Sequence, residues 1–169
     1  MKRWDCLIDA AKILRDEGLQ FVVEIAGAGP LRPALEEAIR RNDLETQVVL
    51  LGEVADVTGL LARASLLVHT SEVEGCPNSV LEAMACGRAV IACRAGDVSE
   101  IVEHGKTGFV VEPNDTAGLV SSIRELILDP VRRREMGLAG RARVERDFQI
   151  DRMVDETLKA YRLAGWMGA

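Results

Sequence analysis

Residues 66–93, with the sequence LLVHTSEVEGCPNSVLEAMACGRAVIAC, decide the fold class. Leu66 to Thr70 is a short apolar run typical of a buried strand, and Ala89 to Cys93 is a second one. Between them, a polar loop leads into a helical segment from Asn78 to Cys86, which Gly87 ends. This order predicts two parallel strands, because a parallel connection must carry the chain back over the sheet, usually as a helix.

The same alternation of helices and short apolar strands continues on both sides of this stretch. The predicted strands are Phe21 to Ala26, Val48 to Leu51, Leu66 to Thr70, Ala89 to Cys93 and Phe109 to Glu112. The predicted helices cover residues 4–14, 31–41, 57–63, 78–86 and 98–103, and three more follow from Ala117. This pattern predicts an α/β fold with a doubly wound parallel sheet, covered by helices on both faces.

Ligands of doubly wound sheets bind at the carboxyl ends of the strands. The loops after Ala26, Leu51, Thr70 and Cys93 are therefore the candidate site, and the loops at the opposite edge are not.

Composition excludes several classes of protein. With 169 residues, 48% of them hydrophobic, the chain is long enough for a single globular domain and is not a disordered polymer. Its net charge of −6 and its 4% aromatic content argue against binding to nucleic acid. No apolar stretch approaches the roughly 20 residues of a spanning helix. The basic run Arg132 to Arg134 is most simply a solvated helix face, so any membrane contact is peripheral.

The four cysteines and two histidines do not suggest a metal site. Cys6, Cys76, Cys86 and Cys93 form no Cys-x-x-Cys pair, and the two histidines lie far apart in the sequence. Single, reduced thiols predict a cytoplasmic protein without a metal or another cofactor.

Two carboxylates in the decisive stretch carry the candidate chemistry. Glu74 lies in the loop after the strand, and Glu82 lies eight residues later in an otherwise apolar helix, which we expect to be buried. The unpaired amides at the start of this helix, from Asn78 to Val80, would attract an anion. A diphosphate between this helix end and two hydroxyl-binding carboxylates fits a nucleotide sugar. Alternatively, Glu82 pairs with an arginine or backbone amides, and Glu74 is an ordinary solvated loop carboxylate.

These residues resemble the Glu-x7-Glu signature of retaining glycosyltransferases with the GT-B fold, in the pattern Glu-Gly-x-Pro-Asn-x-x-x-Glu-Ala-Met-Ala-x-Gly from Glu74 to Gly87. Three further stretches agree in order: residues 27–30 with a Gly-x-Gly-Pro turn, residues 49–53 with a strand ending in Leu-Gly, and residues 100–108 with Glu-Ile-Val-x-x-Gly-x-x-Gly. The resemblance identifies the chain as a donor-binding domain and covers nearly all of it.

The resemblance also implies roles for individual residues. Glu74, the catalytic residue, would touch the transferred sugar, and Glu82 would bind the ribose hydroxyls. Backbone groups of residues 75–78 would face the sugar. The amides of Ser79 and Val80, together with Lys2, would contact the diphosphate. Gly52 would lie near the base. The implied substrate-contacting residues are Lys2, Gly27, Gly29, Gly52, Glu74, Gly75, Cys76, Pro77, Asn78, Ser79, Val80 and Glu82. Transfer would retain the configuration of the sugar, and the leaving diphosphate would help to take the acceptor's proton, without a metal.

The same resemblance implies that parts of the enzyme are absent from these 169 residues. Such transferases have a second, acceptor-binding domain, and their donor domain begins with a strand and a diphosphate-binding arginine that precede Lys2. We therefore expect a gap or an unpaired edge in the sheet, between the strands at residues 21–26 and 66–70, and an inactive chain on its own. The apolar stripe of residues 150–163 also needs a cover, which an acceptor domain or a second copy of the chain would supply. The alternative function is a non-catalytic module that binds a nucleotide or a partner.

Overall fold

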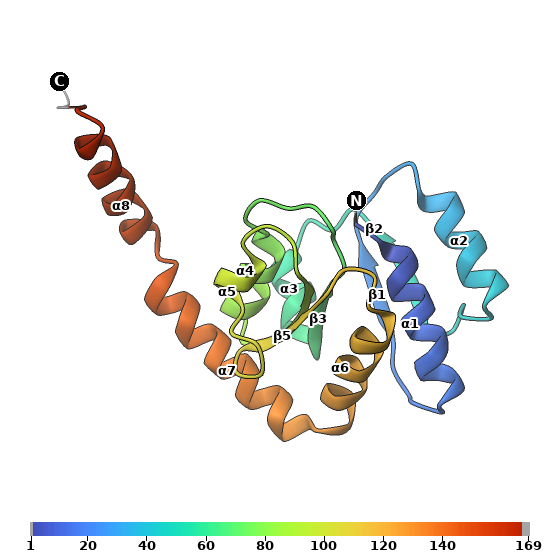
Figure 1. Cartoon of the computed structure of the whole chain (residues 1–169). Helices are drawn as coiled ribbons and strands as arrows, with labels where there is room; N and C mark the ends of the chain where they lie inside the picture. Colours follow the sequence, from blue (N-terminus) through green and yellow to red (C-terminus); the bar gives the residue numbers. More distant parts are fainter. Residues whose placement is uncertain (1, 167–169) are drawn as a thin grey trace.

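The computed structural model describes residues 2–166 and shows helices and strands in alternation (Figure 1). The strands are β1 (Val23–Ala26), β2 (Val48–Gly52), β3 (Leu66–His69), β4 (Ala89–Cys93) and β5 (Gly108–Val111). The helices are α1 (Trp4–Asp16), α2 (Arg32–Arg41), α3 (Val57–Arg63), α4 (Asn78–Ala85), α5 (Val98–Ile101), α6 (Thr116–Leu128), α7 (Pro130–Asp147) and α8 (Ile150–Leu163). The α/β fold with parallel strands is confirmed, with strand ends shifted by one or two residues from prediction.

The strands form two separate parallel sheets. One contains β1 and β2, and the other has the order β3-β4-β5. β1 and β3 each keep one edge without a strand partner among the described residues. This is the break predicted between residues 21–26 and 66–70, and the two flanking strands do not close on each other.

The central strand β4 separates two hydrophobic cores, which explains why all five of its residues are buried. Ala89 and Ile91 face the core formed with α1, α2 and α6. Val90 and Ala92 face the core formed with α3, α4 and α5. Because successive side chains of a strand point to opposite faces, the continuous apolar run at residues 89–93 confirms that helices cover both faces, as a doubly wound sheet requires.

Helix α7 packs tightly against the turn that joins α4 to β4. A Cβ atom on Gly137 would lie 2.1 Å from the carbonyl oxygen of Gly87, whereas one on Gly140 would meet only Met84, at 3.4 Å. The backbones therefore touch at Gly137, but a small side chain fits at Gly140.

This contrast predicts opposite effects of alanine at two positions on one helix. Gly137→Ala should lower the free energy of unfolding by about 1–3 kcal/mol, because the added methyl group must push the α4–β4 turn away. Gly140→Ala should be neutral or stabilising, by up to about 1 kcal/mol, because alanine favours the helix. Urea denaturation of both variants measures the difference. Equal effects would show that α7 can shift to relieve the contact.

Helix α8 extends away from the rest of the molecule (Figure 1) and buries none of its residues. Its apolar stripe is exposed at Ile150, Met153, Val154 and Tyr161. The uncovered stripe and the open strand edges are the features from which self-association is predicted, and that prediction remains. Within residues 2–166, no helix combines the length and apolar character needed to cross a lipid bilayer.

Candidate functional site

The loop between β3 and α4 brings Glu74 and Lys2 together across 72 positions of sequence. Lys2 Nζ lies 2.7 Å from Glu74 Oε1. The position of Lys2 is set by the end of β3, because the buried Thr70 hydroxyl donates a hydrogen bond of 2.7 Å to the Lys2 carbonyl oxygen. Two residues predicted to contact different parts of one ligand therefore meet at the carboxyl end of a strand.

Glu74 is a carboxylate that stays ionised in this environment. The hydrogen bond from Lys2 lowers its pKa to about 2, against the opposing effect of partial burial, and the nearby Ser71 hydroxyl acts in the same direction. Its side chain is 17% exposed, whereas that of Lys2 is 57% exposed. Glu74 can therefore act as a hydrogen-bond acceptor at any physiological pH, while Lys2 is free to move toward a ligand.

His69, the last residue of β3, belongs to this cluster and was missed by the sequence analysis. Its ring is buried, and Nε2 lies 3.3 Å from Glu74 Oε1. Neither ring nitrogen makes a hydrogen bond within the described part of the chain. Burial lowers the pKa of His69, and this outweighs the opposing attraction of Glu74. The one sequence signal that could have identified His69 is its place at the end of the strand, directly before the loop that carries Glu74.

The lowered pKa of His69 predicts a loss of stability in mild acid. As the pH falls below about 6.5, the unfolded chain takes up a proton on His69 before the folded chain does. This protonation stabilises the unfolded state relative to the folded state. The free energy of unfolding should therefore fall more between pH 7.5 and pH 5.5 in the wild type than in His69→Gln. Urea denaturation at both pH values measures this difference, and His104 is present in both proteins. Parallel pH profiles would contradict the assignment.

The start of α4 offers two free amides beside Glu74. Pro77 precedes the helix, and no side chain caps it. The N–H groups of Asn78 and Ser79 have no partner within residues 2–166, but the amide of Val80 donates to the Pro77 carbonyl oxygen at 3.0 Å. The expectation of an unpaired Val80 amide is therefore wrong, because the first turn of the helix closes on Pro77. Two amides remain for an anion.

A neighbouring loop holds the Gly75 region in place. The Asp97 amide donates to the Gly75 carbonyl oxygen at 2.9 Å. Gly96 has φ +50°, and a Cβ there would lie 2.2 Å from the same oxygen, so only glycine allows this approach. Gly75 and Cys76 are exposed at the tip of the loop, whereas Pro77 is buried.

Glu82 is exposed, which corrects the expectation of a buried helix with a costly carboxylate. Helix α4 buries only the face that carries Val80, Ala83 and Met84, because it lies in an outer layer with solvent on its other side. Glu82 makes no ion pair with another described residue, so it is neither paired with an arginine nor desolvated.

The predicted glycines Gly27 and Gly52 meet at the ends of β1 and β2. The Gly27 amide donates to the Gly52 carbonyl oxygen at 2.7 Å, and both have positive φ values, +133° and +73°. Gly29 begins the turn into α2, where its carbonyl oxygen accepts from the Arg32 amide. No hydrogen bond within residues 2–166 joins these glycines to the Glu74 loop. In Figure 1 both loops lie at the upper end of the molecule, on either side of the start of α1.

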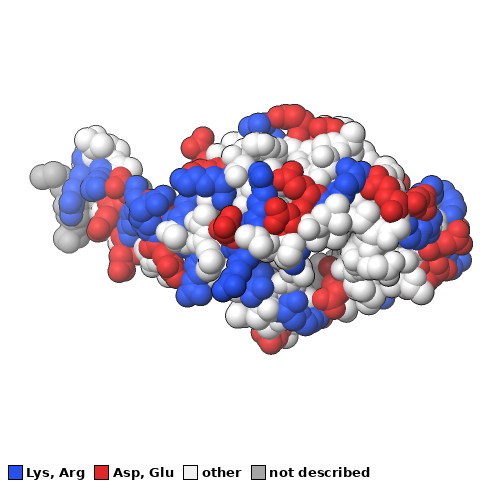
Figure 2. All heavy atoms as spheres, turned by 90° about the horizontal axis from the view of Figure 1, so that it is seen from below, with Lys and Arg blue, Asp and Glu red and all other residues white. Residues whose placement is uncertain are grey.

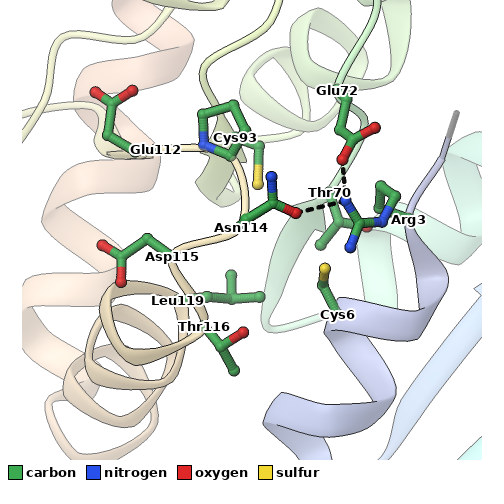
Figure 3. A pocket seen from close by; sticks show the side chains of 11 residues that line it. Arg3, Cys6, Thr70, Glu72, Cys93, Glu112, Asn114, Asp115, Thr116 and Leu119 are labelled. Carbon is green, nitrogen blue, oxygen red and sulfur yellow. Dashed lines mark hydrogen bonds and ion pairs between the residues drawn. The ribbon is translucent and has the colours of Figure 1, made fainter.

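A small hollow beside the Glu74 loop is closed by Arg3 (Figure 3). Arg3 Nη1 bonds Glu72 and, at 2.6 Å, Asn114 Oδ1. The accessible volume is about 10 Å³, which is at most enough for one water molecule. Arg3 thus ties the Glu72 end of the loop to the loop after β5, and this hollow is not a sugar pocket.

Comparisons with known proteins identify the family. The family model described as "Glycosyl transferases group 1" matches residues 1–129. The chain is 31% identical over 157 residues to N-acetyl-alpha-D-glucosaminyl L-malate synthase from Bacillus anthracis, covering 92% of this chain and 41% of that protein. It is 38% identical over 129 residues to a GDP-mannose-dependent mannosyltransferase of phosphatidylinositol monomannoside from Corynebacterium glutamicum, covering 70% of this chain and 34% of that protein.

Solved structures of glycosyltransferases share the fold of this chain. HepE from Anabaena, in complex with UDP-glucose, superposes with a TM-score of 0.83 at 31% identity over 94% of this chain and 45% of that one. The C-terminal domain of a Francisella tularensis glycosyl transferase group 1 family protein, LpcC, gives a TM-score of 0.77 at 29% identity over 88% of this chain and 80% of that domain. The chain spans less than half of the full-length relatives named here, 41% and 34% of the two enzymes and 45% of HepE. The chain belongs to the glycosyl transferases group 1 family, and its fold is that of the GT-B glycosyltransferases.

Proposed function

We propose that this chain is the donor-binding part of a retaining glycosyltransferase and binds a nucleotide-diphosphate sugar at the carboxyl ends of its strands. The observation that carries the proposal is the meeting of Glu74, Lys2 and the free amides of Asn78 and Ser79 around one loop. A carboxylate for sugar hydroxyls thus lies beside a cation and a helix N-terminus for phosphate. The complex of HepE with UDP-glucose supports this ligand class.

In the bound state, Lys2 would exchange its contact with Glu74 for the diphosphate. The exposed Lys2 side chain can make this move, and the freed Glu74 carboxylate then accepts hydrogen bonds from the sugar. Lys2 and the Asn78 and Ser79 amides would stabilise the negative charge that grows on the leaving diphosphate. Glu82, exposed and unpaired, would accept from the two ribose hydroxyls, and Gly52 would lie near the base.

Retaining transfer needs an acceptor, which another domain would bind. We expect the 169 residues alone to bind the donor without transferring the sugar, and the cytoplasmic location stays a prediction. The alternative is a module that binds a nucleotide or a partner chain and never transfers a sugar. Transfer by a longer protein that contains this chain, lost on Glu74→Gln, would decide against the alternative.

Thermal unfolding with UDP, GDP, ADP and their sugars tests donor binding directly. A ligand at 100 times its dissociation constant should stabilise the folded state by about 2.7 kcal/mol, or roughly 5–10 °C for a domain of this size. Uridine, guanosine and adenosine without phosphates serve as controls, since they lack the group that Lys2 and the helix amides would hold. If no nucleotide diphosphate raises the melting temperature at millimolar concentration, the proposal fails.

A further inference from the structure

A second, larger hollow lies at the opposite edge of the sheet, where the strands begin. It has a volume of about 490 Å³. Its walls come from the residues before β3, the α4–β4 turn and the first turns of α7. The lining residues are Arg63, Ala64, Ser65, Cys86, Gly87, Arg88, Pro130, Arg133, Arg134, Leu138 and Arg141. We call it the arginine hollow. Figure 2, which shows this underside, has groups of basic atoms near its middle.

The charge around the arginine hollow is unbalanced. Five arginines and no acidic residue line it, in a chain whose net charge is −6. Arg63 pairs with Glu24 at 2.9 Å, and Arg141 pairs with Glu145 at 2.7 Å. The other three arginines have no carboxylate partner within residues 2–166. Three positive charges therefore stay uncompensated around one hollow.

These three arginines differ in how their N–H groups are used. Arg133 donates to the last carbonyls of α6, at Leu126 and Ile127, and so has a structural role. Arg88 donates through Nη1 to the Ala64 carbonyl oxygen at 3.2 Å, but its Nε is buried without a partner. Arg134 is exposed, and its guanidinium group makes no hydrogen bond or ion pair with another described residue. Unused guanidinium N–H groups favour a ligand with several oxygen acceptors, because a buried donor without a partner is costly.

Phosphate is the anion that best matches this arrangement. The planar fork of a guanidinium group binds phosphate oxygens in pairs. Asp129, on the α6–α7 turn, does not line the hollow, and its Oδ1 accepts from the Arg132 amide at 2.9 Å. We propose that the arginine hollow is a second anion site, which binds a phosphate group at the sheet edge opposite to the Glu74 loop.

Apolar side chains beside the arginine hollow bear on where this phosphate comes from. Leu138 lines the hollow and is 56% exposed, and Leu128 and Val131, on either side of Asp129 and Pro130, are 67% and 66% exposed. A basic hollow with an exposed leucine in its wall suits a phosphate carried next to hydrocarbon, as in a lipid headgroup. A free phosphate compound would use the same arginines without the apolar contact.

Two probes separate these sources. The first is calorimetric titration with inorganic pyrophosphate. The second is co-sedimentation with phosphatidylcholine vesicles that contain 30% phosphatidylglycerol, with pure phosphatidylcholine as reference. The variants are Arg134→Gln, Arg134→Lys and Arg41→Gln. Arg41 is the matched control, because it is also an exposed helical arginine without an ion pair in the described structure. Lys2→Gln reports any pyrophosphate held at the Glu74 loop.

For whichever probe binds, Arg134→Gln should weaken binding by about ten-fold or more. Arg134→Lys should lose less of its binding affinity than Arg134→Gln, because lysine keeps the positive charge but lacks the planar, forked guanidinium group. Arg41→Gln and Lys2→Gln should leave binding at the hollow unchanged. Sedimentation with the anionic vesicles alone assigns the site to a lipid headgroup, and pyrophosphate binding that persists in Lys2→Gln and weakens in Arg134→Gln assigns it to a free phosphate compound. If neither probe binds at 100 mM salt, or if Arg134→Gln and Arg41→Gln behave alike, the proposal is overturned. Donor binding at the Glu74 loop is measured separately and can fail or succeed on its own.

Discussion

Replacing Glu74 by glutamine is expected to weaken the binding of a nucleotide sugar by about 10- to 150-fold, with a much smaller effect on the bare nucleotide. The carboxylate would accept hydrogen bonds from the sugar, and each hydrogen bond to a charged group contributes about 1.5–3 kcal/mol. The amide of glutamine is neutral and turns one acceptor into a donor. In a protein that also contains an acceptor domain, the rate of transfer should fall as well, because Glu74 would contact the reacting sugar.

Calorimetric titration with UDP-glucose and UDP measures this difference, with UDP as the test base unless the thermal screen selects another. Glu72→Gln is the matched control, because Glu72 lies in the same loop but bonds Arg3 at the small hollow. Glu72→Gln should leave both affinities within about three-fold of the wild type. A change of that size would reflect a small adjustment of the loop. Equal losses for UDP-glucose and UDP in Glu74→Gln would contradict the assignment of Glu74 to the sugar.

Replacing Glu82 by glutamine should weaken UDP and UDP-glucose equally, again by about 10- to 150-fold. The two ligands share the ribose whose hydroxyls Glu82 would accept. Because Glu82 is exposed and unpaired in the described structure, the substitution should change the free energy of unfolding by no more than about 0.5 kcal/mol. A loss of binding without a loss of stability is therefore expected.

The control for Glu82→Gln is Glu45→Gln, another exposed carboxylate, which lies before β2 and away from the Glu74 loop. It should change neither affinity nor stability. If Glu82→Gln weakens UDP-glucose but not UDP, the two glutamates have exchanged roles. If it weakens neither ligand, the exposed position of Glu82 is simply that of a solvated helix carboxylate.

Much of the fold could be predicted from the sequence because its signals are local. The apolar run at residues 89–93 and the helix that Gly87 ends each depend on neighbours within a few positions. Helices that alternate with strands leave parallel pairing as the simplest arrangement, and the structure confirms it. The carboxyl-end loops follow from that topology, so the Glu74 loop could be predicted as a candidate site from the sequence.

The exposure of Glu82 could not be predicted in this way. The apolar residues of α4 indicated a buried helix, but burial depends on which layers cover it, and one side of α4 stays open. The prediction that the Val80 amide is unpaired was wrong for a similar reason. Its hydrogen bond to the Pro77 carbonyl oxygen depends on the geometry of the turn at Pro77.

The sequence by itself determined the fold class, the parallel pairing of its strands, and the loop that carries the two glutamates. Only the tertiary structure decided that Lys2 meets Glu74, that His69 lies buried behind them, and that three uncompensated arginines share one hollow. The physical reason is the range of each interaction. Hydrophobic periodicity and turn formation act between close neighbours in the chain, whereas charge pairing and burial depend on groups that are dozens of residues apart and meet only after folding.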